Sequence, residues 1–298
     1  MARHRTRLRR RAGALAAATA ALALTCATAA AADPPDRAAS PPKGHDVSSH
    51  QKNVDWPAAQ ARGARFVYVK ATEATDYQNP YFHQQYDGAR DAGVIRGAYH
   101  FALPDESSGA KQARYFVAHG GDWRADGWTL PPALDIEYNP YSAKHPCYRL
   151  GWKRMTAWIW SFSDELARET GRRPVIYTTA HWWRQCTGDS HAFASRHPLW
   201  VARHGTSDPG ELPGGWQYWT FWQYATSGRL PGDQNLFNGT SGRLRTFAAA
   251  GDPRGAGAPG VPEAEAEPHT PDAVTPLPAP VHLPFTQVAY VHPDNDLE

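Results

Sequence analysis

Between positions 44 and 250 the apolar residues form short runs that alternate with longer amphipathic stretches. Short runs rich in Val, Ile, Tyr and Phe predict buried strands. We expect a first strand ending at 45–47 and further strands at 65–70, 94–101, 132–137, 174–178, 198–202 and 220–224. Apolar residues spaced three and four apart predict helices at 81–91, 109–119 and 148–170. The last of these has a glycine, Gly171, directly after it, as many helices do.

This order of elements predicts an α/β fold. Strands that alternate with helices favour a parallel sheet or a barrel. From Gly205 onward the helical pattern shortens or disappears, so a regular barrel with eight helices is not expected. In barrels of this kind the chemistry lies at the C-terminal ends of the strands.

Composition and charge limit what the chain can do. With 298 residues, 41% of them hydrophobic and 12% aromatic, the chain is typical of a folded domain with appendages. The net charge of +2 averages unlike pieces, because residues 1–32 carry six Arg and no acid, and residues 252–298 carry eight acids and one base. The remaining middle has a charge of about +3, too weak for the basic stripe of a nucleic-acid-binding protein.

Both ends of the chain predict segments outside the folded domain. Residues 1–32 join a basic stretch, a short Ala/Leu run and small residues, which is the pattern of an export signal peptide. The run is shorter than the roughly 20 apolar residues of a membrane-spanning helix, so we expect a secreted, extracellular protein with no integral membrane segment in the mature chain. Residues 33–43 read as a short linker, and residues 251–298 as a Pro-rich, acidic, disordered tail.

The cysteines predict one disulfide. Cleavage of the export signal would remove Cys26 and leave Cys147 and Cys186 in an oxidising compartment. An even number of cysteines in such a compartment favours a bond between them.

Two acids two residues apart, Asp135 and Glu137, are the clearest chemical signal in the sequence. Residues i and i+2 of a strand point to the same face, so the two carboxyl groups are expected side by side in the barrel mouth. Like charges this close cannot both ionise freely, so one pKa should rise, as general acid catalysis requires. A structural pair bound to Lys70 or Arg203 is the alternative.

Further short motifs follow the other predicted strands. They are Asp46-Val47-Ser48, Tyr68-Val69-Lys70, Gly97-Ala98-Tyr99-His100, Leu134-Asp135-Ile136-Glu137, Ile176-Tyr177-Thr178, Phe221-Trp222-Gln223-Tyr224 and Pro231-Gly232-Asp233. Together and in this order they resemble the glycoside hydrolase family 25 muramidases, the secreted bacterial lysozymes, over residues 44–250. The resemblance implies an irregular TIM-like barrel with five βα units followed by three strands with few helices. It also implies hydrolysis of the β-1,4 bond between N-acetylmuramic acid and N-acetylglucosamine in peptidoglycan.

The resemblance also implies a role for each site residue. Glu137 matches the acid that protonates the leaving oxygen, and Asp135 matches the acid that assists the attacking 2-acetamido group of the substrate. Direct attack by water is the alternative. Asp46 and Asp233 match two supporting acids. The expected substrate contacts are Tyr99, Tyr177, Trp200 and Gln223, for each of which core packing is the alternative. No metal or cofactor is implied, and we expect a monomer.

Other interpretations stay open beside this one. A catalytically weak peptidoglycan-binding module on the same fold is one, although the sequence retains all four acids. A metal-dependent polysaccharide deacetylase is another, and it would need a His-rich ligand set. Lys70 and Glu73 are expected to form a structural ion pair beneath the site, and His100 to be a hydrogen-bonded histidine of the barrel.

Overall fold

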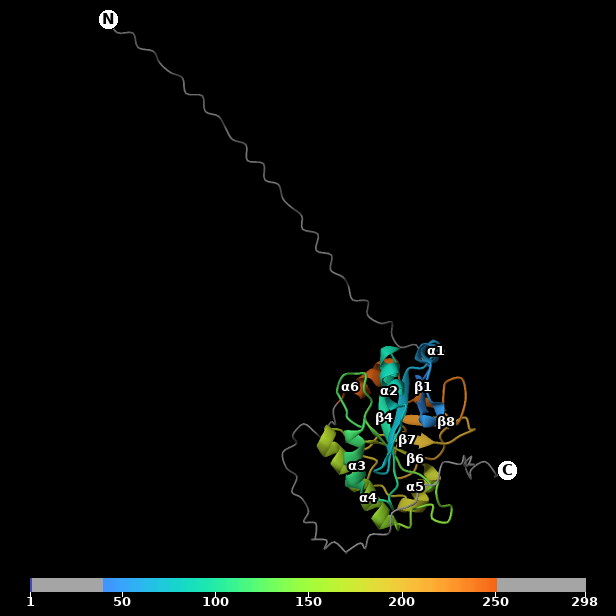
Figure 1. Ribbon diagram of the computed structural model, residues 1–298. Helices are drawn as coiled ribbons and strands as arrows, with labels where there is room; N and C mark the ends of the chain where they lie inside the picture. Colours follow the sequence, from blue (N-terminus) through green and yellow to red (C-terminus); the bar gives the residue numbers. More distant parts are fainter. Residues whose placement is uncertain (2–39, 251–298) are drawn as a thin grey trace. The chain divides into compact units, whose positions relative to one another are not determined.

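The computed structural model describes residues 40–250, together with Met1 (Figure 1). The export signal predicted for residues 1–32 and the tail predicted for residues 251–298 lie outside the described residues. Most of the linker predicted for residues 33–43 does so too. Lys43 already belongs to the first strand, so that strand begins one residue earlier than the predicted domain boundary.

Eight strands form a closed barrel, and one short strand lies beside it. The barrel strands are β1 (Lys43–Val47), β2 (Phe66–Glu73), β4 (Ile95–Phe101), β5 (Ala133–Asp135), β6 (Val175–Thr179), β7 (Leu199–Ala202), β8 (Phe221–Ala225) and β9 (Asp233–Phe237). Their order is β1-β9-β8-β7-β6-β5-β4-β2, and the pairing of β1 with β2 closes the ring. The short β3 (Tyr77–Gln78) pairs antiparallel with the end of β2.

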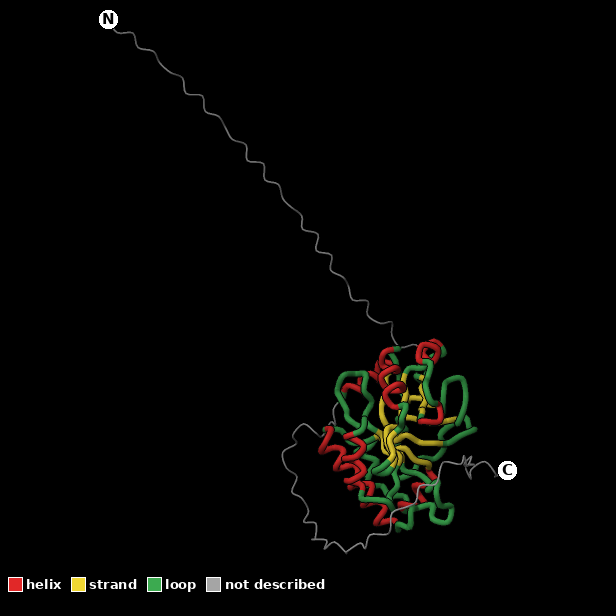
Figure 2. Tube along the Cα trace, in the orientation of Figure 1, coloured by secondary structure: helices red, strands yellow, loops and turns green. Residues whose placement is uncertain are grey.

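Helices follow the first five barrel strands. They are α1 (Trp56–Ala61), α2 (Phe82–Asp91), α3 (Gly109–Ala118), α4 (Trp152–Thr170) and α5 (Ala180–Thr187), and α6 (Ser241–Ala249) follows the last strand. A short 3-10 turn, Ser49–Gln51, lies between β1 and α1. The helices surround the strands in Figure 2, and the order of elements confirms the predicted five βα units and three further strands.

One strand of the barrel, β9, differs in direction from the other seven. This strand runs antiparallel to both of its neighbours, β1 and β8. The connection from β8 to β9 covers residues 226–232, which is shorter than the dozen or so residues that a parallel crossover needs. Gly232, with φ +74°, allows the tight turn before β9.

Several predicted boundaries also change. The strand predicted at 132–137 is only Ala133–Asp135, so Glu137 lies in the loop after β5. The helix predicted at 148–170 begins at Trp152, and the strand predicted at 65–70 continues to Glu73. The sequence patterns did not predict α1, α5, α6 or β9.

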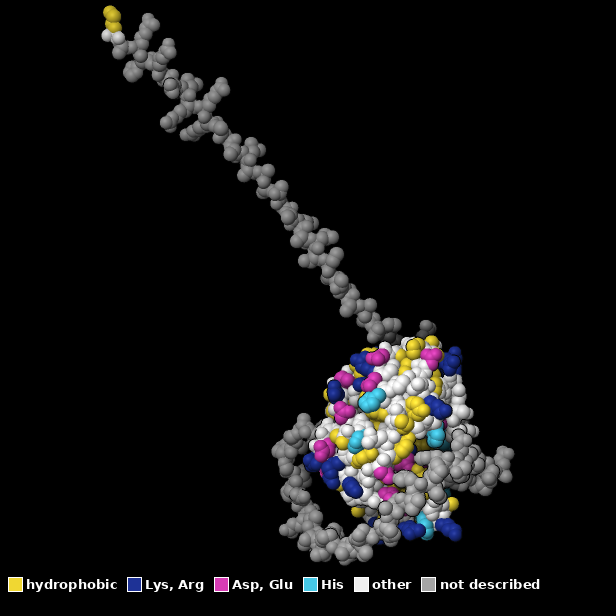
Figure 3. Space-filling model, viewed as in Figure 1, with side chains coloured by type: hydrophobic (Ala, Val, Ile, Leu, Met, Phe, Trp, Pro, Cys, Tyr) yellow, Lys and Arg dark blue, Asp and Glu magenta, His cyan; other side chains and the backbone are white. Residues whose placement is uncertain are grey.

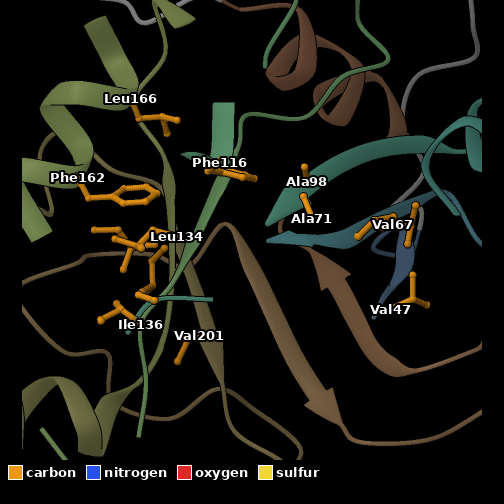
Figure 4. Packing of buried hydrophobic residues seen from close by; sticks show 14 of the residues in the cluster. Val47, Val67, Ala71, Ala98, Phe116, Leu134, Ile136, Phe162, Leu166 and Val201 are labelled. Carbon is orange, nitrogen blue, oxygen red and sulfur yellow. The ribbon is translucent and has the colours of Figure 1, made fainter. Parts of the chain in front are cut away.

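Alternating strand residues divide the core into two clusters. Residues that face outward, such as Val67, Leu134 and Val201, pack against the helices. Figure 4 shows Phe162 extending from α4 toward the strand that carries Leu134. Residues that face inward fill the barrel with rings, where Tyr68 stacks on Trp200 at 4.7 Å between ring centroids. These rings occupy the interior, so the polar inward positions lie nearer the C-terminal ends of the parallel strands.

The side of the molecule drawn in Figure 3 has no large surface patch of a single charge sign. Basic and acidic side chains are interspersed there (Figure 3), in agreement with the weak charge of the middle segment. Within the part of the chain that the structure describes, no helix is both long and apolar enough to cross a bilayer.

Candidate active site

The inward-facing positions of the strands change from aromatic to polar toward one end of the barrel. Along β8, Phe221 belongs to the inner cluster, and Gln223, two residues later, is polar and buried. Along β5, Ala133 is followed on the same face by Asp135. Strand register places Asp135 beside Tyr177 of β6 and Asp46 of β1 beside Asp233 of β9. The structure therefore gathers the predicted acids and their neighbours at one barrel mouth.

Two amide side chains hold Asp46. Its Oδ2 accepts hydrogen bonds from Gln223 Nε2 at 2.9 Å and from Asn235 Nδ2 at 2.6 Å. Trp200 in turn donates its indole N–H to Asn235 Oδ1 at 2.8 Å. Burial raises the pKa of Asp46 to about 6, and the two amide hydrogen bonds oppose that rise because they stabilise the carboxylate. Asp46 is thus a fixed, buried acid that titrates near neutrality.

A tight turn carries Asp233. His45 Nδ1 lies 2.6 Å from the carbonyl oxygen of Pro231, and because that oxygen can only accept, His45 donates. Burial lowers the pKa of His45 to about 4, so its ring is neutral near pH 7. A Cβ on Gly232 would lie 2.0 Å from the Asp46 carbonyl oxygen, so only glycine fits this close approach. The turn and the end of β1 therefore hold Asp233 beside Asp46.

Asp135 and Glu137 differ in their surroundings. Asp135 is 7% exposed, and its Oδ1 is buried with no hydrogen-bond partner. Glu137 is partly exposed and accepts no hydrogen bond from any residue between 40 and 250. Burial raises the pKa of Asp135 well above its ordinary value, the charge of Glu137 raises it further, and Lys70 opposes the rise. Burial also raises the pKa of Glu137 to about 7, which Lys70 again opposes.

Asp233 completes a set of four acids whose pKa values are all raised. Burial and the charges of Asp46 and Glu137 raise the pKa of Asp233 to about 8. Four carboxyl groups that share one mouth with one nearby lysine cannot all be charged at pH 7. The cluster therefore retains protons at neutral pH, which is the condition for general acid catalysis.

Lys70 forms the expected ion pair beneath the site. Its Nζ lies 2.6 Å from Glu73 Oε2, and Tyr141 donates its hydroxyl to the other oxygen of Glu73. Arg203 pairs with Asp208 at 3.0 Å. Neither cation forms an ion pair with Asp135 or Glu137, so the alternative of a structural salt bridge there has no support among the described contacts.

The four predicted contact residues lie at or beneath the mouth. Tyr177 donates its hydroxyl to Gln223 Oε1 at 2.9 Å, and Tyr99, on β4 beyond the intervening β5, is 9% exposed. Trp200 is 2% exposed and supports Asn235. Their direct contact with a substrate stays a prediction.

Sequence reasoning missed several residues of the mouth. Asn235 was given no role, although it lies two residues after Asp233 on the same strand and could have been singled out by that spacing. His204, in the loop after β7, donates its Nε2–H to Gln223 Oε1 at 2.8 Å. Tyr138 and His181 form a short hydrogen bond beside the site. No periodic pattern in the sequence marks either of these two contacts.

The structure confirms two further predictions. Cys147 and Cys186 form the expected disulfide, with Cα atoms 5.3 Å apart, and Cys186 lies in helix α5. His100 is fully buried and has two hydrogen-bond partners, Thr72 Oγ1 at 2.8 Å and Gln112 Oε1 at 2.9 Å. Over residues 40–250 no three His, Cys, Asp or Glu side chains are grouped so as to hold a metal ion.

Comparison with known proteins gives a family match that covers this mouth. The model of the family described as glycosyl hydrolases family 25 matches residues 45–233. An N,O-diacetylmuramidase from Chalaropsis sp is 46% identical over 209 residues, which are 69% of this chain and 98% of the relative. Lysozyme M1 from Streptomyces globisporus is 46% identical over 211 residues, 69% of this chain and 71% of the relative.

Solved structures agree with this match. The structure of a glycoside hydrolase family 25 lysozyme from Aspergillus fumigatus has a TM-score of 0.68 and 47% identity, and covers 70% of this chain and 99% of that one. The bacterial lysozyme from Streptomyces coelicolor has a TM-score of 0.68 and 46% identity, with 70% and 98% covered. The residues matched by the family model include all four acids, Asp46, Asp135, Glu137 and Asp233.

Proposed function

The chain belongs to the glycosyl hydrolases family 25, and from that premise we propose that it is a lysozyme acting on peptidoglycan. The bond cleaved is the β-1,4 bond between N-acetylmuramic acid and N-acetylglucosamine. The names of two relatives, a diacetylmuramidase and a lysozyme, support this choice of substrate. The protein is secreted, acts outside the cell as a monomer and needs no cofactor.

The observation that carries the proposal is the state of Glu137. Its pKa of about 7 keeps the carboxyl group largely protonated at mildly acidic pH and about half protonated at pH 7. No described residue occupies its oxygens, and it is partly exposed at the mouth, so a glycosidic oxygen can reach its proton. These are the properties of a general acid that protonates a leaving group.

Asp135 supplies the partner for the substrate's acetamido group. Its Oδ1 is a buried acceptor without a partner, and such an acceptor is costly unless a ligand donates to it. The N–H of a 2-acetamido group placed there would stabilise the charged form of Asp135 and lower its pKa. The remaining proton of the pair then stays on Glu137. Substrate binding thus leaves Asp135 ionised and Glu137 protonated, as cleavage requires.

Asp46 and Asp233 act by charge and position. Both lie across the mouth from β5 on paired positions of β1 and β9. An ionised Asp46 raises the pKa of Glu137 and of Asp233, because like charges repel. An ionised Asp46, held by Gln223 and Asn235, would also stabilise the positive charge that develops on the sugar ring in the transition state.

Mass spectrometry of the fragments released from a defined peptidoglycan tests the proposal. We expect new reducing ends that are all N-acetylmuramic acid. Reducing ends of N-acetylglucosamine would indicate a glucosaminidase, and release of acetate without chain cleavage would indicate a deacetylase. Adsorption to the polymer without any release would support the binding module instead.

A further inference from the structure

A pocket of about 1170 Å³ lies at the end of the barrel opposite the four acids. Its lining includes Arg173, Pro198 and Thr220, which precede β6, β7 and β8, together with residues of α6. The four acids lie at the other mouth of the barrel. Asp46 and Asp135 are at the C-terminal ends of β1 and β5, Glu137 is in the loop after β5, and Asp233 is at the start of the antiparallel β9. At about 3.3 Å per residue, β8 alone separates Thr220 from Gln223 by roughly 10 Å. The pocket is therefore separate from the candidate active site.

The lining of this pocket is basic. It contains four arginines, two histidines and no carboxyl side chain: Arg172, Arg173, Arg196, Arg243, His191 and His197. Arg196 and Arg243 are exposed, and neither forms an ion pair with a residue of the described part of the chain. Two exposed cations in a concave surface without carboxylates attract anions.

Aromatic rings lie beside these arginines. Tyr218 is 69% exposed, and among the aromatic side chains of residues 40–250 it shares such exposure with Tyr141 and Trp152, each 62% exposed. Trp219 is partly exposed next to it, and Asn238 fixes the loop by donating to the Trp219 carbonyl oxygen at 2.9 Å. Flat apolar rings pack on the faces of sugars, and guanidinium groups bind carboxylates through charge-assisted hydrogen bonds.

We propose that this pocket is a second binding site for peptidoglycan, distinct from the site that cleaves it. The inference rests on the proposed function, because the wall polymer joins sugar rings to peptides that end in carboxylates. Charge complementarity with Arg196 and Arg243, and the rings of Tyr218 and Trp219, fit that chemistry together. Since the two sites lie at opposite ends of the barrel, they engage different strands of the wall, and the second contact raises the effective concentration at the first.

Adsorption to insoluble peptidoglycan, stripped of attached phosphate polymers, tests this site. The assay uses the full chain in a Glu137→Gln background so that the polymer stays intact. Replacing both arginines, Arg196→Gln and Arg243→Gln, should weaken adsorption by roughly 2- to 30-fold, as expected for two exposed ion pairs. Tyr218→Ala should weaken it further. Added salt should reduce the difference that the arginines make.

The matched control removes two exposed arginines elsewhere, Arg62→Gln and Arg154→Gln, and should adsorb like the parent. With Glu137 restored, the pocket variant should cleave a soluble, uncross-linked glycan fragment at the parent rate and solubilise the insoluble polymer more slowly. Equal adsorption of pocket variant and parent, or an equal loss in the control, overturns the proposal. A third outcome also overturns it: the pocket variant adsorbs like the parent but loses as much thermal stability as a variant that lacks residues 251–298. In that case the chain's own acidic segment would occupy the pocket. A parent that cleaves no soluble fragment refutes the proposed function alone.

Discussion

Replacing Glu137 by glutamine removes one proton and little else. The amide has nearly the volume of the carboxyl group, and the structure gives Glu137 no hydrogen bond to a residue between 40 and 250 that the change would break. Glu137→Gln should therefore fold as the parent does and still bind peptidoglycan. What it loses is the acidic proton that a leaving sugar oxygen needs.

The expected loss of activity follows from the role of Glu137 as a general acid and from its pKa. General acid assistance contributes typically ~10²–10⁴-fold, or about 3–5 kcal/mol of transition-state stabilisation. Because burial raises the pKa of Glu137 to about 7, the parent's rate should fall on the alkaline side of pH 7 as this proton is lost. At pH 9 only about 1% of the groups would stay protonated. The variant's residual rate should lack that alkaline decline.

Initial rates of clearing of purified cell walls, measured from pH 5 to pH 9, give both the loss of rate in the variant and the pH dependence of each protein. Circular dichroism is the folding control. Asp135→Asn is the matched comparison, since it also replaces an acid by its amide. It should retain more activity than Glu137→Gln, because it weakens the orientation of the acetamido group and leaves the proton donor in place. A folded Glu137→Gln variant that keeps more than about a tenth of the parent rate would refute this assignment. Asp46 or Asp233 would then be the next candidates.

Three further predictions concern the surroundings of the site. The pKa of Asp233 in the folded state is raised to about 8, so its ionisation opposes folding as pH rises above about 4. Asp233→Asn should therefore raise Tm at pH 9 by roughly 2–8 °C and leave it unchanged at pH 4. A larger gain in Tm at pH 4 than at pH 9 would contradict this direction of the pH dependence. His45→Phe keeps a buried ring but loses the hydrogen bond to Pro231, so kcat on a soluble glycan should fall with KM unchanged, and an unchanged kcat would show that the turn holds Asp233 without it. Thiol labelling of the unfolded, unreduced protein should find Cys147 and Cys186 blocked, and reduction should cost about 4 kcal/mol of stability for this separation of 39 residues; two labelled thiols would show that the bond is absent.

The sequence by itself determined the features that depend on short spacings. The period of two along a strand was enough to place Asp135 on the inner face. Helical spacing located α2, α3 and α4 to within a few residues. These patterns work because burying one face of a strand or helix constrains residues that are only a few positions apart.

Only the tertiary structure decided which distant groups meet. Asn235 and Asp46 are 189 residues apart in sequence, and His45 and Pro231 are 186 apart, yet each pair is hydrogen-bonded. No local pattern specifies such partners. They follow from closure of the barrel, in which β9 pairs with β1 in the antiparallel direction. The basic pocket depends on closure in the same way, because its arginines come from α6 and from loops before different strands. Short-range periodicity fixes the face on which a side chain lies, whereas burial of the whole sheet fixes which residues lie across from it.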